Sequence, residues 1–225
     1  MTQVFSPYIY ISIYIFLYIY VSLDHAKSVL EFWFGSMHGN VQITKSGSWF
    51  FSTPEQDDEI KKTFGRWVRA AVKGGLKNWE SHPRTALAKV ILLDQFTRNI
   101  YRGTKEAFDG DKEARRVAKM ALNRWPEYYH PMEKMFLAMP FMHSELINDQ
   151  DLCIRYFKEM IDEARMNEHV EEEIIEHLEN GLKFAESHRD VIRDFRRFPS
   201  RNKALERENT PPEEEYLKTS GGWGQ

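Results

Sequence analysis

Apolar side chains recur at helical spacing through most of the chain after residue 24, and proline or glycine interrupts each run. The clearest run begins at Thr53-Pro54, where proline takes the first helical position and acidic residues follow in the first turn. It ends at Gly74, a residue type that commonly terminates helices. Its apolar stripe repeats every three to four residues and consists of Ile60, Phe64, Trp67, Val68 and Ala71. The pattern predicts an amphipathic helix with one buried face.

Further runs of the same kind predict helices over residues 28–34, 83–102, 111–125, 131–139, 149–165, 170–197 and from 211 onward. Ser28 and Asp149 are the expected N-caps of two of them, and Pro140 is expected to break a third. No segment after residue 24 has a convincing strand pattern. Because amphipathic helices joined by short loops must bury their faces against each other, we expect one all-α domain built from antiparallel helical hairpins.

Length and charge exclude some classes of protein. The chain has 225 residues, which is typical of one domain, and its formal net charge is −3. A negative balance gives no reason to expect binding to nucleic acid. The single cysteine, Cys153, excludes an intramolecular disulfide and favours a reducing compartment.

The first 23 residues differ from the rest because they carry no charged side chain and are rich in Ile and Tyr. One interpretation is a membrane anchor through residues 4–23, with Lys27 on its flank placing the body in the cytoplasm. The alternatives are a signal peptide, an edge strand, or an extension that the working protein does not need. The expected organisation is therefore a hydrophobic segment over 1–23, a helical domain over 24–218 and a flexible tail over 219–225.

The segment L-L-D-Q-F-T-R-N-I-Y-R-G places polar residues beside buried apolar ones. On a helix, Asp94, Arg98 and Arg102 share one face, and Gln95 and Asn99 form the adjacent row. One interpretation is a structural seam of salt bridges, since a carboxylate four residues before an arginine suits an intrahelical pair. The other is that the guanidinium groups bind an anion while Asp94 holds one of them in place.

A second polar group, His143 and Glu145, lies in the Met- and Phe-rich stretch P-F-M-H-S-E. The simplest interpretation of the histidine is a hydrogen-bonded core residue. General acid or base catalysis is an alternative, because the pKa of histidine lies near neutrality. A metal site would need further ligands such as His188, and nothing in the spacing specifies one.

A third segment, residues 188–202, carries a dense run of arginines. A solvated helix face and an anion pocket are both consistent with it. Nucleic acid is disfavoured, because a strongly acidic stretch lies just upstream and the net charge is negative. The sequence contains none of the phosphate-loop, dinucleotide, zinc-protease, paired-cysteine or nucleophile-elbow motifs, so we predict no metal and no cofactor.

The blocks V-L-E-F-W-F-G, L-L-D-Q-F-T-R-N-I-Y-R-G, P-F-M-H-S-E and H-R-D-V-I-R-D-F-R-R-F-P-S-R-N follow one another in the order and spacing of one family. Over residues 28–218 the chain resembles domain-of-unknown-function family 924, a mostly bacterial group without an established activity. The resemblance implies an all-α, TPR-like array of helical hairpins. Thr97 stands where the family often has proline and Ser200 where it often has histidine, and residues 1–23 have no counterpart. The family's signature positions correspond to Asp94, Gln95, Arg98, Asn99, Arg102, His143, Ser144, Glu145, His188, Arg189, Arg197, Pro199, Arg201 and Asn202.

Three functions are compatible with these features. TPR-like folds tend to present a concave face, so the first is a binding module for a peptide or protein partner. The second is an enzyme or small-molecule binder with an Arg/His/Asp pocket for a phosphate or carboxylate, and the third is a scaffold in which the same residues form only buried salt bridges. For a pocket, the expected ligand-binding residues are Asp94, Gln95, Arg98, Asn99, Arg102, Arg189, Arg197, Arg201 and Asn202, and the catalytic candidates are His143, Glu145 and His188.

Overall fold

The computed structural model describes residues 23–36, 41, 47, 49 and 52–219, and no strand occurs in that part of the chain. The all-α prediction is therefore confirmed. Residues 23–34 form the first described helix. The labelled helices are α3 (Pro54–Val72), α4 (Pro83–Val90), α5 (Thr97–Ile100), α6 (Asp111–Arg124), α7 (Pro131–Met142), α8 (Ile147–Met166), α9 (Glu172–Phe195) and α10 (Pro211–Thr219).

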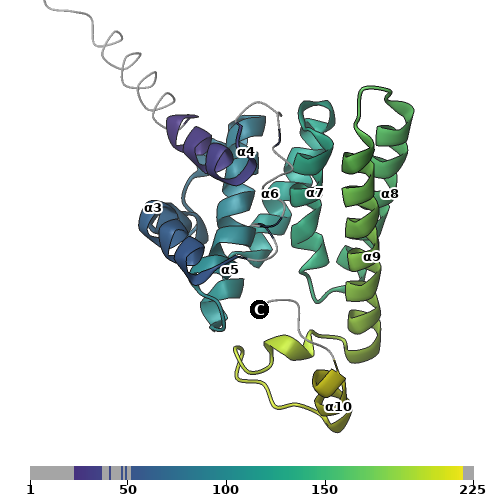
Figure 1. The fold of residues 1–225 in the computed structure, drawn as a ribbon. Helices are drawn as coiled ribbons and strands as arrows, with labels where there is room; N and C mark the ends of the chain where they lie inside the picture. The colour runs from purple at the N-terminus through teal and green to yellow at the C-terminus, as the bar shows by residue number, and fades with distance from the viewer. Residues whose placement is uncertain (1–22, 37–40, 42–46, 48, 50–51, 220–225) are drawn as a thin grey trace, which may run out of the picture.

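Helices that follow one another along the chain pack side by side (Figure 1). The last three long helices, α7, α8 and α9, form one group, and α6 lies between α7 and α4. On the other side, α3 packs against the segment that runs from α4 into α5. Beyond the end of α9 the chain turns under the bundle and finishes with α10. The TPR-like stacking of these hairpins stays a prediction.

The expected N-cap at Ser28 is wrong, because the helix already includes residues 23–27. Ser28 lies inside it, and its hydroxyl donates to the Asp24 carbonyl oxygen at 3.1 Å. Ala26 is fully buried together with Val29. The buried stripe therefore extends upstream of Ser28. Packing of that stripe stabilises the helical turn before the serine, which explains why the helix does not begin there.

The break at Pro140 and the cap at Asp149 are also wrong. Helix α7 continues through Pro140 to Met142, because this last turn is buried and only one backbone hydrogen bond is lost there. Helix α8 begins two residues before Asp149, which lies in the first turn and accepts a hydrogen bond from the Ser144 hydroxyl at 2.6 Å. By contrast, Thr53 caps α3 as expected, accepting from the backbone N–H of Gln56.

The long helix predicted from Pro83 contains a wide turn that the sequence pattern does not reveal. Between α4 and α5, the segment η3 (Ile91–Phe96) is π-helical. Such turns insert extra backbone into a helix and occur frequently at functional sites. All six residues of η3 are buried, including Asp94 and Gln95, so the wide turn lies inside the bundle.

Aromatic rings connect the N-terminal helix to the centre of the bundle. The Trp33 ring lies 5.5 Å from the Phe96 ring and 5.6 Å from the Phe136 ring, both edge-to-face. Trp49 packs on Phe136 at 5.0 Å, and its indole N–H donates to the Trp33 carbonyl oxygen at 2.7 Å. Edge-to-face pairs of this kind add about 0.5–1.5 kcal/mol each to the free energy gained by burial.

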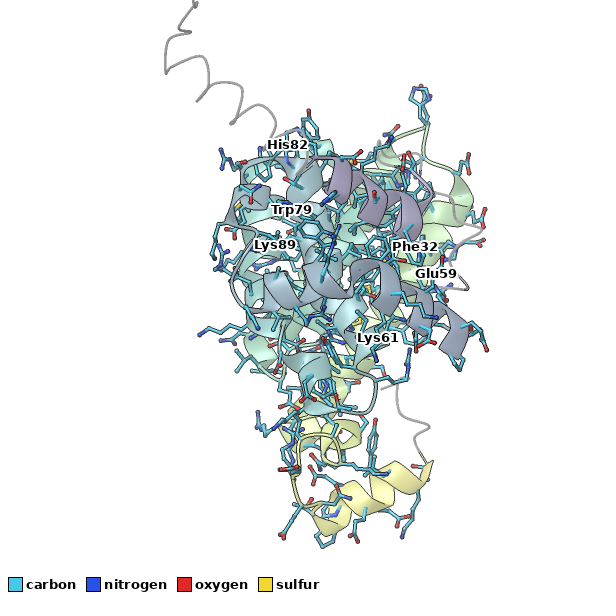
Figure 2. All side chains as sticks on the ribbon, turned by 90° about the vertical axis from the view of Figure 1, so that its left-hand side faces the viewer. Phe32, Glu59, Lys61, Trp79, His82 and Lys89 are labelled. Carbon is cyan, nitrogen blue, oxygen red and sulfur yellow. The ribbon has the colours of Figure 1, made fainter. Side chains whose placement is uncertain are left out.

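Two buried ion pairs stabilise the bundle away from the polar residues of η3. Arg84 of α4 forms two hydrogen bonds with Glu133 of α7, at 2.7 and 2.8 Å, and both side chains are buried. Lys89, labelled in Figure 2, is fully buried and lies 2.7 Å from Glu80 and 3.4 Å from Glu113. Each buried charge has an opposite partner, as burial requires.

Within the described part of the chain, no helix combines the length and the apolar character needed to cross a membrane. The anchor predicted for residues 4–23 lies almost wholly outside the described residues, so it remains a prediction.

Gly110 lies against the wide turn, where a Cβ atom would overlap the Leu93 carbonyl oxygen. We expect Gly110→Ala to lower the free energy of unfolding by about 1–3 kcal/mol, because backbone would have to shift. The control is Gly65→Ala in α3, where the nearest atom is the flexible Arg69 side chain at 3.4 Å. That variant should be stabilised by about 0.5–1 kcal/mol. Denaturant unfolding measures both, and equal stabilities would contradict close packing at Gly110.

Candidate functional site

A pocket opens where the η3–α5 helix, the end of α7 and the chain after α9 meet. Its volume is about 210 Å³. The lining residues are Trp49, Ser52, Gln95, Arg98, Asn99, Arg102, Gly103, Ala107, Phe108, Met139, His143, Ser200, Lys203 and Ala204. Five of the residues singled out in the sequence are among them: Gln95, Arg98, Asn99, Arg102 and His143.

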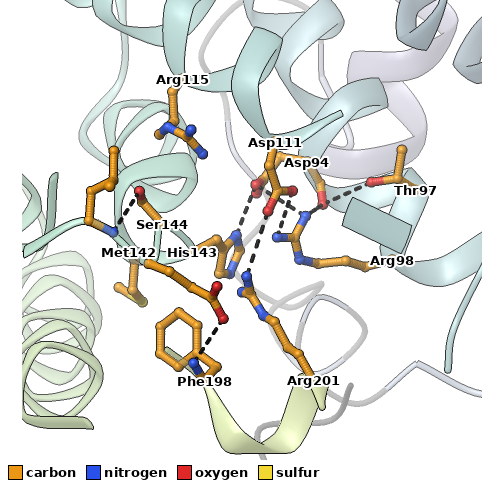
Figure 3. Close-up of polar contacts among 12 residues, drawn as sticks. Asp94, Thr97, Arg98, Asp111, Arg115, Met142, His143, Ser144, Phe198 and Arg201 are labelled. Atoms are coloured by element: carbon orange, nitrogen blue, oxygen red, sulfur yellow. Dashed lines mark hydrogen bonds and ion pairs between the residues drawn. The ribbon is translucent and has the colours of Figure 1, made fainter. Parts of the chain in front are cut away.

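Beneath the pocket, Asp94 contacts three side chains, of which Figure 3 shows His143 and Arg98. One carboxylate oxygen lies 2.8 Å from Nδ1 of His143, and the other accepts a hydrogen bond from the Gln95 amide. The Arg98 guanidinium lies 3.3 Å from the same carboxylate and donates to the Asp94 carbonyl oxygen at 2.6 Å. Because Nδ1 is engaged, Nε2 is the ring nitrogen of His143 left for the pocket.

Asp94 is ionised and His143 is neutral near pH 7. Burial alone would raise the pKa of Asp94, but His143 and the Arg98 guanidinium outweigh burial and lower it to about 2. Burial, followed by the charge of Arg98, lowers the pKa of His143, although the Asp94 carboxylate opposes the shift. The imidazole therefore donates from Nδ1–H to Asp94 and carries its lone pair on Nε2.

A second carboxylate, Asp111 at the start of α6, holds two arginines from distant parts of the chain (Figure 3). It accepts from Arg98 at 3.0 Å and lies 3.7 Å from Arg201. The Arg201 guanidinium is also positioned between two aromatic rings, 4.4 Å from the centroid of Phe198 and 4.8 Å from that of Phe108. Burial and the neighbouring Arg98 lower the pKa of Arg201 to about 10, which leaves it charged at neutral pH.

His188 of α9 lies behind this cluster, not on the lining of the pocket. Its Nδ1 is 2.8 Å from the Phe184 carbonyl oxygen, and its ring packs edge-to-face on Phe198 at 5.6 Å. Burial, followed by the proximity of His143, lowers its pKa to about 3. His188 is therefore a neutral, hydrogen-bonded residue at the base of the site.

The rim of the pocket carries a hydrogen-bonded group around Asp57 of α3. The carboxylate accepts from the Asn99 amide at 2.7 Å and from Nε of Arg102 at 3.1 Å. Arg102 also donates to the Ser52 hydroxyl at 2.6 Å. Lys203, on the opposite wall, is exposed and has no ion-pair partner among the side chains that the structure describes.

The wall that bears Ser200 and Lys203 begins in the 3₁₀ turn η6 (Pro199–Arg201), and Glu145 holds that wall in place. Its carboxylate accepts from the Phe198 backbone N–H at 2.9 Å and forms two hydrogen bonds with Arg207, each 2.9 Å long. Both oxygens are thereby occupied. This geometry gives Glu145 a positioning role, although the sequence made it a catalytic candidate.

Five predicted ligand-binding residues do not line the pocket: Asp94 and Arg201 belong to the buried cluster described above, and the other three make contacts elsewhere. Arg197 forms two hydrogen bonds with Glu213 of α10, at 2.6 and 2.7 Å. The Asn202 amide donates to Asn209 at 2.9 Å. Arg189 is on the outer side of α9 and lies 3.5 Å from its neighbour Asp190. The first two stabilise the C-terminal segment, and the third pairs with a surface carboxylate.

The sequence did not indicate Asp111, Phe108 or Lys203 as site residues. Asp111 looked like an acidic residue in the first turn of a helix, which it also is. Its proximity to both Arg98 and Arg201 depends on the packing of α6 against η3, which no local pattern encodes. The excess of arginines over nearby carboxylates in residues 188–202 was the available signal that a partner from elsewhere was needed.

No group of three or more His, Cys, Asp and Glu side chains is arranged to hold a metal ion within residues 23–36, 41, 47, 49 and 52–219. The nitrogen and oxygen atoms at the pocket belong to guanidinium, amide, hydroxyl and imidazole groups, together with one ammonium group. Such a donor set is suited to binding an anion.

Fold and site together define an all-helical protein with a small basic pocket above a buried Asp–His pair. The family model described as "Bacterial protein of unknown function (DUF924)" matches residues 29–221. The chain belongs to this family, which confirms the resemblance seen in the sequence.

One solved structure shares the fold over most of its length. It is the "Structure of Protein of Unknown Function ATU0120 from Agrobacterium tumefaciens", which aligns with a TM-score of 0.71 and 29% sequence identity. The alignment covers 88% of this chain and 99% of that one. No curated protein sequence gives a significant match. The similarities therefore establish family and fold, and function has to be argued from the site.

Glu145→Gln should loosen the wall of the pocket, because it removes the charge that holds Arg207. We expect a local loss of about 1–2 kcal/mol, so that amide exchange in residues 199–210 becomes about 5–30-fold faster. Hydrogen–deuterium exchange with peptide resolution measures this. Glu163→Gln, which removes an exposed partner of Lys134, is the control. Unchanged exchange in residues 199–210 would refute the positioning role of Glu145.

His188 should make stability depend on pH. Its pKa is about 3 in the folded protein and about 6.5 when unfolded, so the unfolded chain binds a proton that the folded chain does not. Stability should fall as the pH decreases from about 6.5, by up to about 1.4 kcal/mol per pH unit. Urea unfolding of His188→Asn between pH 6.5 and 4.5 should give a shallower slope than the parent. The exposed His169→Asn should keep the parental slope, and equal slopes for all three proteins would disprove the assignment.

Proposed function

We propose that the protein binds a small anionic ligand, with a carboxylate or phosphate group, in the pocket above Asp94 and His143. The observation that carries this proposal is the charge of the lining. Its ionised side chains are Arg98, Arg102 and Lys203, and none of the described residues that line it is acidic. Cations around a partly desolvated cavity favour an oxyanion.

The carboxylates that balance the arginines lie behind or beside the pocket. Asp94 and Asp111 hold Arg98 from the buried side, and Asp57 holds Arg102 at the rim. Contacts of this kind fix the guanidinium groups before a ligand arrives, which reduces the entropy lost on binding. They also lower the net positive charge, so we expect modest affinity for simple anions.

The volume of about 210 Å³ favours a compact ligand. Pockets for drug-sized molecules are typically about 300–1,000 Å³. A small organic acid or a single phosphate group suits this cavity better than a nucleotide or a peptide backbone.

The second candidate function is catalysis: an enzyme that binds the same kind of anion in this pocket as its substrate. The observation that favours it is the Asp94–His143 pair, in which a buried carboxylate orients an imidazole whose other nitrogen is left for the pocket. A carboxylate that orients a histidine in this way is a recurrent arrangement in general-base catalysis.

Binding of a peptide or protein partner, the first function expected from the sequence, stays a prediction. Among the described residues, four large apolar side chains are exposed: Tyr128, Leu146, Met166 and Phe184. They are spread over several elements, whereas peptide grooves gather such side chains.

The proposal is tested by thermal unfolding with phosphate, sulfate, malate and succinate in a low-chloride buffer. At a concentration 100 times the dissociation constant, binding to the folded state adds about 2.7 kcal/mol and should raise Tm by about 5–10 °C. Lys203→Ala should weaken binding about 3–10-fold, since it removes a cation that has no described ion-pair partner.

Arg189→Ala is the matched control, because it removes a partly exposed cation outside the pocket. Binding in that variant should be unchanged. The absence of a shift with all four anions would overturn the proposal, and so would equal losses in Lys203→Ala and Arg189→Ala. Stabilisation by peptides alone would favour the partner-binding function.

A further inference from the structure

His143 contributes a hydrogen-bond acceptor to a pocket whose ionised lining side chains are all cations. Its Nδ1 is engaged with Asp94 at 2.8 Å, and the side chain lines the pocket, so Nε2 is the atom available there. No described side chain donates to Nε2. The Gln95 amide, the nearest polar neighbour in sequence to Asp94, is directed to Asp94 and to the sulfur of Met139.

The surrounding charges keep Nε2 an acceptor. Arg98 from α5 and Arg201 from η6 disfavour a second positive charge, and burial acts in the same direction. Asp94, with a pKa of about 2, stays ionised and keeps the Nδ1 proton on the ring. His188 from α9, the remaining titratable group that faces His143, has a pKa of about 3 and is neutral above pH 5. Because burial and the neighbouring arginines lower its pKa below 6.5, His143 is neutral at pH 7.5 and Nε2 accepts a hydrogen bond there.

An oxyanion without a proton would place an oxygen lone pair against the lone pair of Nε2. An oxyanion with an O–H group can instead donate to Nε2 while its charged oxygens contact the arginines and Lys203. We propose that the pocket selects small oxyanions that also carry an O–H donor, such as hydrogen phosphate or a hydroxycarboxylate, and that His143 is the residue that selects them. This inference rests on the proposed anion-binding function and names its ligand class.

The size of the preference follows from one hydrogen bond. A site that accepts a hydrogen bond from its ligand leaves the acceptor unpaired when the analogue lacks the donor. Since the pocket is open to water, the loss is partly compensated, and we expect about a tenfold difference in affinity.

Two pairs of anions isolate this effect in the full chain. Phosphate and sulfate are both tetrahedral, but only hydrogen phosphate carries a proton at pH 7.5. Malate and succinate are both four-carbon dicarboxylates, but only malate has a hydroxyl group. Titration calorimetry at pH 7.5 should show about tenfold tighter binding of phosphate than of sulfate, and of malate than of succinate.

His143→Asn removes the acceptor at the position of Nε2 but leaves Asp94 with a hydrogen-bond donor. The amide nitrogen of asparagine can take the place of Nδ1 and donate to the carboxylate. The variant should bind the two members of each pair with equal affinity. Lys203→Ala is the control: it should weaken all four anions by a similar factor and retain the tenfold preference. A preference that persists in His143→Asn would overturn the assignment to His143.

The outcomes separate this inference from the proposed function. Equal affinities within both pairs, together with weaker binding in Lys203→Ala, would support the proposed anion-binding function but overturn the proposed selectivity. Tighter binding of sulfate or succinate than of its partner would overturn it too. No binding of any of the four anions would overturn the proposed function and this inference together.

Discussion

The site depends on the interactions of one buried carboxylate, that of Asp94. It is fully buried, and an isolated charge there would cost several kcal/mol. Arg98, His143 and Gln95 together satisfy it, and each of these side chains is thereby fixed in orientation. The same contacts join the η3–α5 helix to the end of α7. One buried charge therefore both connects two helices and determines which atoms of its partners are left for the pocket.

The C-terminal wall is stabilised in a different way from the rest of the bundle. Its apolar cluster is small, with Val191, Ile192 and Phe198 buried apart from the main core. Ion pairs supply further attachment, through Glu145 with Arg207 and Glu213 with Arg197. Since polar contacts exchange with water more readily than an apolar core opens, this wall is the part of the described site best suited to move as a ligand enters.

The sequence predicted the helices well where proline and glycine limit them, as at Pro54 and Gly74, because these residues act through local sterics. It predicted poorly where burial decides, as at Ser28 and Pro140, because packing against distant helices outweighs local preference.

For the site, helical spacing predicted the shared face of Asp94 and Arg98 but could not place distant residues beside it. The structure has His143 2.8 Å from Asp94 and Arg201 3.7 Å from Asp111. The partnership of Asp111 with both arginines could not be predicted, since it depends on how α6 packs on the wide turn.

That wide turn has a consequence for how the family can vary. Residues 91–96 contain more backbone per turn than a regular α-helix, which advances about 100° per residue. A deletion of one residue between positions 91 and 94 would close the wide turn to a regular helix, so that the helix on either side keeps its place while side chains inside the turn take new directions. The Asp94 carboxylate would then no longer meet His143 while the rest of the fold stayed intact. The chain length of this short stretch is therefore as much a determinant of the cavity as the identity of its side chains, and an insertion or deletion there would separate the architecture from whatever chemistry it supports.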